Sequence, residues 1–305
     1  MATGPRKAPV ALTRYDAGPV ARPESGMKGL RKIGAVDAVS GRAVAFDVTT
    51  SLKPALAFHK AASCNGGAAG RHQASGPYGR MPEPENVGGM RLYLSSYRLG
   101  HQPQALLDLV GANRTCVVIG NALDMYGSTA RAIYAATVYD PVAELTKLGF
   151  TATPLDLRAY FGDPDGLRAA LAGVGLVWVL GGNSFLLRKA MAQSGFDGVI
   201  RDLLDRDAVV YGGFSAGAIV AGPTLNGLDL MDDPAIAVAG YPEAVVWDGL
   251  QIYDRSIVPH AKSQHPESPL ADLAADHLVE NAIPFTALHD GQVIVVDGDN
   301  VRLLS

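Results

Sequence analysis

Short apolar runs alternate with helical stretches from residue 90 to the end of the chain. The runs at 176–180 and 208–212 are apolar throughout, as is typical of strands covered on both faces. Three more strands are expected at 91–95, 115–120 and 151–155, and helices at 128–148, 164–172 and 184–206. This alternation predicts an α/β fold, a mostly parallel sheet with helices on both faces and right-handed crossovers.

The last third of the chain continues this pattern with shorter elements. A strand is expected at 256–258, a helix at 268–281 and strands at 285–288 and 292–296. The residues Asp297-Gly298-Asp299-Asn300 favour a tight turn, so strand 292–296 is predicted to form a hairpin with 301–304.

The first 89 residues have a different composition. They mix Gly, Ala, Pro, Ser and Arg without sustained periodicity, and one short candidate strand, 43–48, stands alone. This pattern predicts a low-complexity, mostly disordered extension at 1–89, followed by one folded domain at 90–305. An alternative interpretation is that the start is mis-assigned and the natural chain begins at Met90.

Composition excludes several classes of protein. The formal net charge is -4 and no basic stripe is present, so no nucleic-acid partner is expected. No apolar run approaches the roughly 20 residues of a membrane span, and the N-terminus lacks the apolar region of a secretory signal. The expected location is therefore the cytoplasm. Cys64 and Cys116 form neither a disulfide framework nor the spacing of a metal site, and no metal is expected.

The motif Gly213-Phe214-Ser215-Ala216-Gly217 follows an inner apolar strand and precedes a helix rich in small residues. A nucleophilic serine in hydrolases occupies such a tight turn, where flanking glycines allow close approach of neighbouring backbones. The sequence therefore predicts Ser215 as a nucleophile. The alternative interpretation is a plain strand-to-helix turn in which Ser215 caps the helix.

A nucleophilic serine needs a general base and an acid that orients it. His260 lies just beyond the expected strand 256–258 and is the favoured base, because strand ends are where sites form in α/β sheets. The weaker candidates are His101, His265, His277 and His289. The candidate acids lie between Ser215 and His260, where spacing alone does not choose among Asp229, Asp232, Asp233, Glu243, Asp248 and Asp254.

A second glycine turn, Gly181-Gly182-Asn183, also lies between an apolar strand and a helix. Such a loop can supply one backbone N–H group to an oxyanion hole, and the N–H of Ala216, after the nucleophile, can supply another. No phosphate-binding loop is present, because the Gly-Lys-Ser/Thr sequence is missing.

Together these motifs resemble the dipeptidase E family of serine peptidases, which also contains cyanophycinase. Four stretches carry the resemblance, and they extend from about residue 90 to 296: Leu180-Gly181-Gly182-Asn183-Ser184-Phe185, Gly213-Phe214-Ser215-Ala216-Gly217-Ala218, Pro223-Thr224 with Asp232-Asp233-Pro234, and Val258-Pro259-His260. The resemblance implies a fold like that of class I glutamine amidotransferases, with serine at the nucleophile elbow.

The resemblance also implies site residues. Ser215 would be the nucleophile, His260 the base and Asp232 the orienting acid, with Asp233 as a near alternative. Gly182 and Ala216 would form the oxyanion hole. Asn183 and Lys262 would bind substrate. The family's aspartyl dipeptidases have an arginine downstream of the histidine, whereas residues 261–270 contain Lys262 as their one cation, which predicts altered specificity because lysine lacks the bidentate fork.

The expected function is therefore hydrolysis of dipeptides or short peptides through a Ser–His–Asp acyl-enzyme, with no cofactor and a small peptide as the partner. Two other hypotheses stay open, an esterase of the α/β-hydrolase type and a non-catalytic binding protein on the same fold. The oligomeric state is not predicted.

Overall fold

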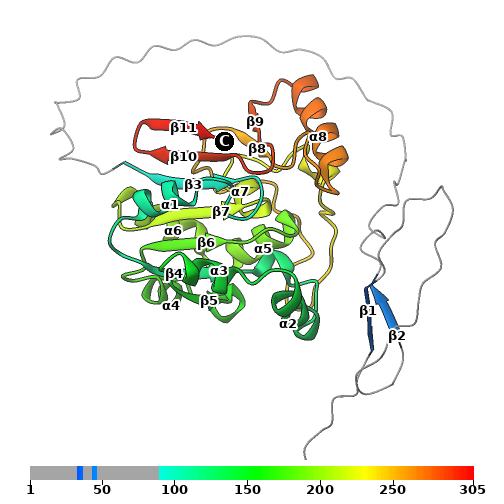
Figure 1. The fold of residues 1–305 in the computed structure, drawn as a ribbon, viewed down its shortest axis with the longest axis horizontal. Helices are drawn as coiled ribbons and strands as arrows, with labels where there is room; N and C mark the ends of the chain where they lie inside the picture. The colour runs from blue at the N-terminus through cyan, green and yellow to red at the C-terminus, as the bar shows by residue number, and fades with distance from the viewer. Residues whose placement is uncertain (1–32, 37–42, 47–88) are drawn as a thin grey trace, which may run out of the picture. The chain divides into compact units, whose positions relative to one another are not determined.

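The computed structural model describes residues 33–36, 43–46 and 89–305 (Figure 1). In the first of these parts, β1 (Ile33–Val36) pairs antiparallel with β2 (Ala43–Phe46). The expected strand at 43–48 is thus present, but the expectation that it stands alone is wrong. The predicted disorder of the rest of 1–89 and the start at Met90 lie outside the described residues.

A seven-stranded sheet forms the centre of residues 89–305, in the order β11-β10-β3-β7-β6-β4-β5. The five strands from β3 to β5 are parallel, and β10 is antiparallel to both β3 and β11. The strands are β3 (Arg91–Ser95), β4 (Thr115–Ile119), β5 (Thr151–Leu155), β6 (Leu176–Val179), β7 (Val210–Phe214), β10 (Val293–Asp297) and β11 (Asn300–Leu304). The predicted parallel sheet and the terminal hairpin are confirmed.

Helices cover both faces of this sheet, as the sequence predicts (Figure 1). On one face, α1 (Pro103–Val110) and α3 (Pro141–Lys147) pack against side chains such as Trp178. On the other face lie α4 (Pro164–Ala170), α5 (Ser184–Ser194), α6 (Phe196–Asp205) and α7 (Ala216–Ile219). Helix α2 (Ser128–Thr137) precedes α3 in the chain, and single 3-10 turns are η1 (Asn121–Leu123), η2 (Leu157–Tyr160) and η3 (Leu228–Leu230).

Two of the expected helices are each divided in the structure. Gly195 adopts a left-handed conformation, with φ 71°, and separates α5 from α6. Asp140 caps α3 through hydrogen bonds to the backbone N–H groups of Val142 and Ala143, and Pro141 begins the helix. Helix α1 was not expected. The divisions follow local chemistry, since glycine tolerates positive φ and proline fits the first helical turn.

A second, two-stranded sheet pairs β8 (Ser256–Val258) with β9 (Phe285–Ala287) in parallel. Helix α8 (Ser268–Glu280) connects the two strands and packs with them in a separate apolar cluster that includes Val258, Ala274 and Leu278. Parallel strands end at the same edge, so residues that follow β8 and β9 are brought together.

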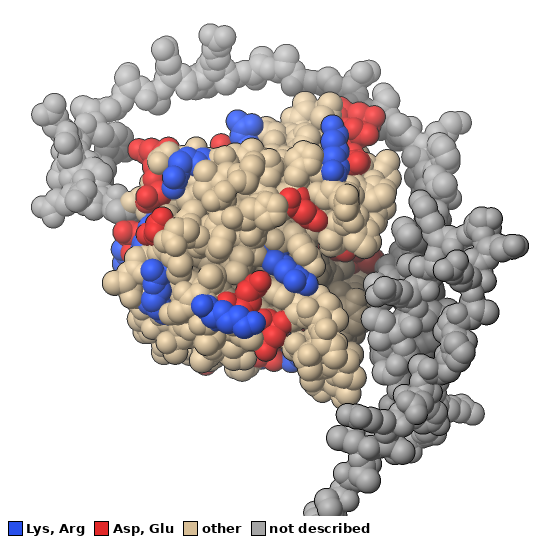
Figure 2. Space-filling model, in the orientation of Figure 1, with Lys and Arg blue, Asp and Glu red and all other residues tan. Residues whose placement is uncertain are grey.

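The surface in Figure 2 carries Lys and Arg side chains interspersed with Asp and Glu, without a large region of one sign on the face shown. Among the described residues, none of the helices has both the length and the apolar character needed to cross a bilayer.

Candidate active site

Ser215 occupies the turn between β7 and α7 in a strained backbone conformation, with φ 50° and ψ -118°. A positive φ is rare for a non-glycine residue and marks strain at functional sites. The Ser215 N–H donates to the carbonyl of Ser95, at the end of the adjacent strand β3, at 3.3 Å. The nucleophile elbow predicted from the sequence therefore has the expected place, after an inner strand.

The glycines around the elbow are required by close packing. A Cβ added to Gly217 would lie 2.3 Å from the Val179 carbonyl oxygen, and one at Gly213 would lie 2.8 Å from the backbone of Gly217. A Cβ on Gly181 would lie 3.0 Å from the Cβ of Ser215. Val179 at the end of β6, and Gly181 in the turn after it, thus lie directly against the turn that carries Ser215.

Two backbone N–H groups near this turn lack an acceptor within the described ranges. Gly182 has φ 135°, a region that side chains disfavour, and a Cβ there would lie 2.5 Å from the Ala122 carbonyl oxygen. Ala216 begins α7, so its N–H has no partner within the helix. In the described part of the chain, neither of these two N–H groups has a hydrogen-bond acceptor. Both are free to receive a developing negative charge.

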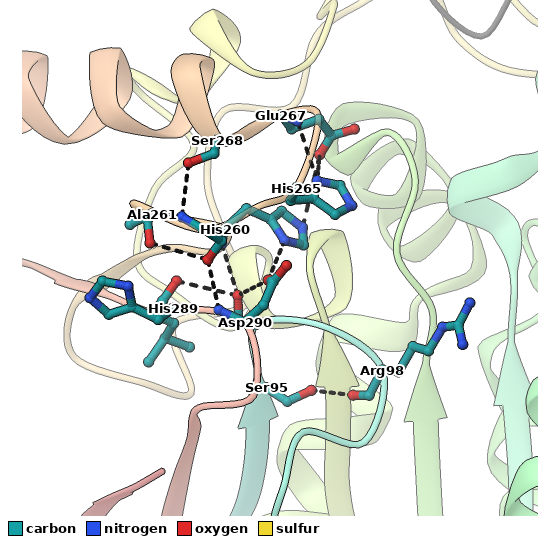
Figure 3. A network of polar contacts seen from close by, with 12 residues as sticks. Ser95, Arg98, His260, Ala261, His265, Glu267, Ser268, His289 and Asp290 are labelled. Carbon is teal, nitrogen blue, oxygen red and sulfur yellow. Dashed lines mark hydrogen bonds and ion pairs between the residues drawn. The ribbon is translucent and has the colours of Figure 1, made fainter. Parts of the chain in front are cut away.

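His260 lies just after β8, as predicted, and its side chain is buried, with 1% of its surface exposed. The backbone has φ 62°. Its N–H donates to Ser96 Oγ at 2.8 Å, and its Nδ1 lies 2.7 Å from Asp290 Oδ1 (Figure 3). The imidazole therefore has a carboxylate partner that is not among those sought in the sequence.

Asp290 is itself fixed by two hydroxyl groups. Ser96 Oγ lies 2.8 Å from Asp290 Oδ1, and the backbone N–H of Asp290 donates to Ser263 Oγ at 2.8 Å. The hydroxyl of Ser96 thus contacts both His260 and its carboxylate partner. These contacts orient the His260–Asp290 pair.

Tyr97 connects the base to the turn that carries Ser215. Its ring lies edge-on to His260, at 6.0 Å between centroids, and edge-on to Phe214, at 6.4 Å. Phe214 directly precedes Ser215. One aromatic ring therefore contacts both His260 and the residue that directly precedes Ser215.

Asp232 does not bind His260, which corrects the expectation that it orients the base. Its carboxylate instead accepts the N–H of Ser184 at 2.9 Å and the Ser184 hydroxyl at 2.7 Å. Asp232 therefore stabilises the start of α5 at the N-terminal end of its dipole. Asp233, the near alternative, accepts the N–H of Ala235.

The local sequence does not predict Asp290 as the acid, because His289-Asp290-Gly291 has the pattern of a turn and the candidate acids lie before His260. The signal that could have found it is the pairing of β8 with β9, in which Val258 is opposite Ala287. His260 is two residues beyond Val258 and Asp290 three beyond Ala287. Parallel pairing of these two strands brings both residues to one edge.

The two residues expected to bind substrate have other surroundings. The Asn183 side chain is buried, accepts the N–H of Leu186 at 2.8 Å and donates to the Asp233 carbonyl at 2.9 Å. Asn183 thus serves as the cap of α5. Lys262 is exposed, and its backbone N–H donates to Asp272.

Of the other candidate histidines, His265 is the one that joins the site. Its ring stacks on that of His260, with centroids 3.8 Å apart and planes at 12°. His277 belongs to α8 and bonds Asn281, and His289 is exposed. His101 is exposed beside Gly291.

The environment shifts the pKa of several ionisable groups in and beside the site. Burial, and secondly the neighbouring His265, lower the pKa of His260 to about 4, against the opposing effect of Asp290. Burial, with the negative charges of Asp232 and Asp290, raises the pKa of Glu267. Burial raises the pKa of Asp232 to about 6, although its hydrogen bonds with Ser184 oppose this. His260 is therefore neutral at neutral pH, the state that a general base requires.

His260, His265 and Glu267 also bring three side-chain atoms of metal-ligating type within 4.8 Å of one another. The nitrogen lone pairs lie in the planes of the two rings, and because these planes are nearly parallel, the lone pairs do not meet at a common point. One ring would have to rotate before both could bind the same cation. The present arrangement therefore favours a base in contact with a second imidazole over a metal centre.

The model of peptidase family S51 matches residues 95–304 of the chain. The chain belongs to peptidase family S51. The match spans the elbow, the Gly181-Gly182 turn and the His260–Asp290 pair. It confirms the family, and with it the enzyme class, that the motifs predict.

A curated relative and two solved structures are similar to the chain. The uncharacterized peptidase Lin0382 of Listeria innocua is 29% identical over 116 residues, which are 38% of this chain and 52% of that protein, so the alignment spans about half of the relative. A crystal structure of a candidate peptidase E protein from Listeria monocytogenes EGD-e has a TM-score of 0.57 at 22% identity, covering 71% of this chain and 99% of that one.

The second structure is that of a peptidase from an acI-B1 Actinobacterium, with a TM-score of 0.52 at 13% identity, covering 72% of this chain and 88% of the other. At these identities the two structures bear on the fold alone, and they agree with the parallel sheet described above.

Proposed function

We propose that this S51 member is a serine peptidase that hydrolyses dipeptides or other short peptides. Ser215 would be the nucleophile, His260 the general base and Asp290 the acid that orients it. The observation that carries the proposal is the 2.7 Å contact between the buried imidazole of His260, at Nδ1, and Asp290 Oδ1. The strained conformation of Ser215 in its turn adds to it.

The contact with Asp290 determines which nitrogen acts as the base. A carboxylate at Nδ1 holds the proton on that nitrogen and leaves Nε2 unprotonated. Nε2 then takes the hydroxyl proton of Ser215 as Oγ attacks the peptide carbonyl carbon. The imidazolium that forms is stabilised by Asp290.

The tetrahedral intermediate places negative charge on the former carbonyl oxygen. The N–H groups of Gly182 and Ala216 have no acceptor among the described residues and are proposed to bind this oxygen. His260 then gives its proton to the leaving amine, and the peptide C–N bond breaks. Water, deprotonated by His260, hydrolyses the acyl-enzyme and frees Ser215.

The test uses the purified chain and its Ser215→Ala variant. Both are incubated with a panel of dipeptides, and free amino acids are measured. We expect cleavage by the unaltered chain alone, together with labelling of Ser215 by a fluorophosphonate probe. Equal cleavage by both proteins, or no cleavage of any peptide, would contradict the proposal.

Labelling of Ser215 without cleavage of any peptide would point instead to a different acyl substrate. Hydrolysis of p-nitrophenyl esters, measured on the same two proteins, separates that outcome from an inactive fold.

A further inference from the structure

Arg98 lies on the loop between β3 and α1, close to the proposed nucleophile. Its guanidinium carbon is 4.9 Å from the ring centroid of Tyr97 and 4.3 Å from that of Tyr139. Both tyrosine rings lie edge-on to Phe214, at 6.4 Å and 6.1 Å. One aromatic ring therefore separates this cation from the residue that precedes Ser215.

The charge of Arg98 has no acidic partner among the described residues. Five other arginines each pair with an aspartate at 2.5–2.8 Å: Arg91, Arg131, Arg158, Arg168 and Arg188. Arg98 makes no such ion pair, and its Nε is buried without a hydrogen-bond acceptor. A buried donor without an acceptor is costly, and such a group in a site is satisfied when an acceptor binds.

The loop that carries Arg98 is held in place. The hydroxyl of Tyr93 donates to the carbonyl of Leu99 at 2.6 Å and lies 3.0 Å from the carbonyl of Gln102. The Ser95 hydroxyl donates to the Arg98 carbonyl (Figure 3). Arg98 itself has φ 50°. Anchoring on both sides of a strained residue positions its side chain before any ligand arrives.

The position of Arg98 relative to His260 indicates which end of a substrate it meets. Tyr97 contacts the guanidinium on one side and lies edge-on to His260 on the other. His260 is proposed to protonate the leaving amine, so the leaving residue lies on the side of His260. In the second residue of a dipeptide, one carbon separates that amine from the terminal carboxylate. In Figure 3 the guanidinium also points away from Asp290.

We infer that Arg98 binds the C-terminal carboxylate of the peptide's leaving residue. This inference rests on the proposed peptidase function, and it explains why the substrates would be short. A cation at a fixed distance from the scissile bond selects peptides that end one residue beyond it. The planar guanidinium suits a carboxylate better than an ammonium does.

The experiment measures binding and turnover separately. In the Ser215→Ala background, calorimetry gives the Kd of Asp-Leu and of Asp-Leu-amide, with and without Arg98→Gln. We expect Arg98→Gln to weaken binding of Asp-Leu by at least about tenfold and to leave the amide within about threefold, since one charge-assisted hydrogen-bonded pair is lost. Arg302→Gln, on exposed β11, is the matched control and should change neither value.

With Ser215 present, kcat/KM is measured for Asp-Leu, Asn-Leu and Asp-Leu-amide. The preference for the free carboxylate over the amide should collapse in Arg98→Gln and return in part in Arg98→Lys. A uniform loss on all three substrates would overturn the inference and make Arg98 a structural residue. The inference would also be overturned if Arg98→Gln removed the preference for Asp-Leu over Asn-Leu instead. The same holds if Lys262→Ala removed the preference for the free carboxylate over the amide.

Failure of the proposed function gives a different pattern. The unaltered chain would then hydrolyse none of these peptides and would not be labelled at Ser215, and the Ser215→Ala protein would bind the free acid and the amide equally.

Discussion

Ser96 Oγ lies 2.8 Å from the backbone nitrogen of His260, although 164 residues separate the two in sequence. The preceding residue, Ser95, accepts the N–H of Ser215. The end of β3 therefore positions the proposed base and the proposed nucleophile through neighbouring residues, and the buried hydroxyl of Ser96 also contacts Asp290.

Replacing Ser96 with Ala should impair both stability and turnover. The buried His260 N–H would lose its acceptor, which costs about 1–3 kcal/mol of unfolding free energy. A displaced imidazole should also lower kcat more than it changes KM. Urea unfolding and steady-state kinetics measure the two effects. Ser194→Ala is the control, because that buried hydroxyl donates to the Met191 carbonyl away from the site. If Ser96→Ala had the same kcat as this control, Ser96 would not position His260 for turnover.

Asp290→Asn should lower kcat by about 10³–10⁴, because an amide no longer keeps the proton on Nδ1 of His260. Asp232→Asn is the matched comparison, since that carboxylate contacts Ser184 instead. It should leave kcat within a few fold. Steady-state rates on one dipeptide measure both variants. The opposite ranking would restore Asp232 as the orienting acid.

Gly181→Ala should suppress reaction of Ser215 while the protein stays folded. The new methyl would lie 2.9 Å from Phe214 Cε2 and 3.0 Å from Ser215 Cβ, closer than ordinary contact. The elbow would have to shift to accommodate it. Fluorophosphonate labelling measures the effect. Gly120→Ala, whose methyl would have an ordinary 3.5 Å contact with Leu180, should label normally.

The pH dependence of kcat/KM should reflect the depressed pKa of His260. A base with a pKa of about 4 is neutral above that value, so activity should be lost only as the pH falls toward 4 rather than through 6.5. In His265→Asn the loss of activity at acid pH should occur at a higher pH than in the unaltered chain, because the substitution admits water to His260 and removes a neighbouring cation. The control His277→Asn, away from the site, should lose activity at the same pH as the unaltered chain. If His265→Asn did the same, His265 would not influence the pKa of His260.

Asp232 should make stability depend on pH in a defined direction. Its pKa is raised in the folded state, to about 6, so its contribution is full below about pH 4 and is lost as the pH rises through 6. Relative to Asp232→Asn, the unaltered chain should lose about 2 kcal/mol of unfolding free energy between pH 4 and 7. Thermal or urea unfolding across this range measures the difference. The exposed neighbour Asp233→Asn should show no comparable change.

Local sequence patterns were enough to predict most of the sheet and the elbow. Strand 91–95 has the predicted bounds, and Ser215 follows an inner strand because apolar runs and glycine turns are local signals. The helix expected at 184–206 is divided at Gly195, where backbone conformation outweighs helical periodicity.

The acid could not be found in the same way. Whether Asp232 or Asp290 meets His260 depends on the pairing of β8 with β9, which is a non-local property. The isolation of Arg98 from any described carboxylate is equally invisible in the sequence, since it requires knowing where every acidic side chain lies.

The division of the site between two sheets has a consequence for how activity can be lost. Ser215 follows β7 of the large sheet, whereas His260 and Asp290 follow the two strands of the small one. Damage confined to the small sheet would remove proton transfer as a unit and leave an intact but unreactive serine turn.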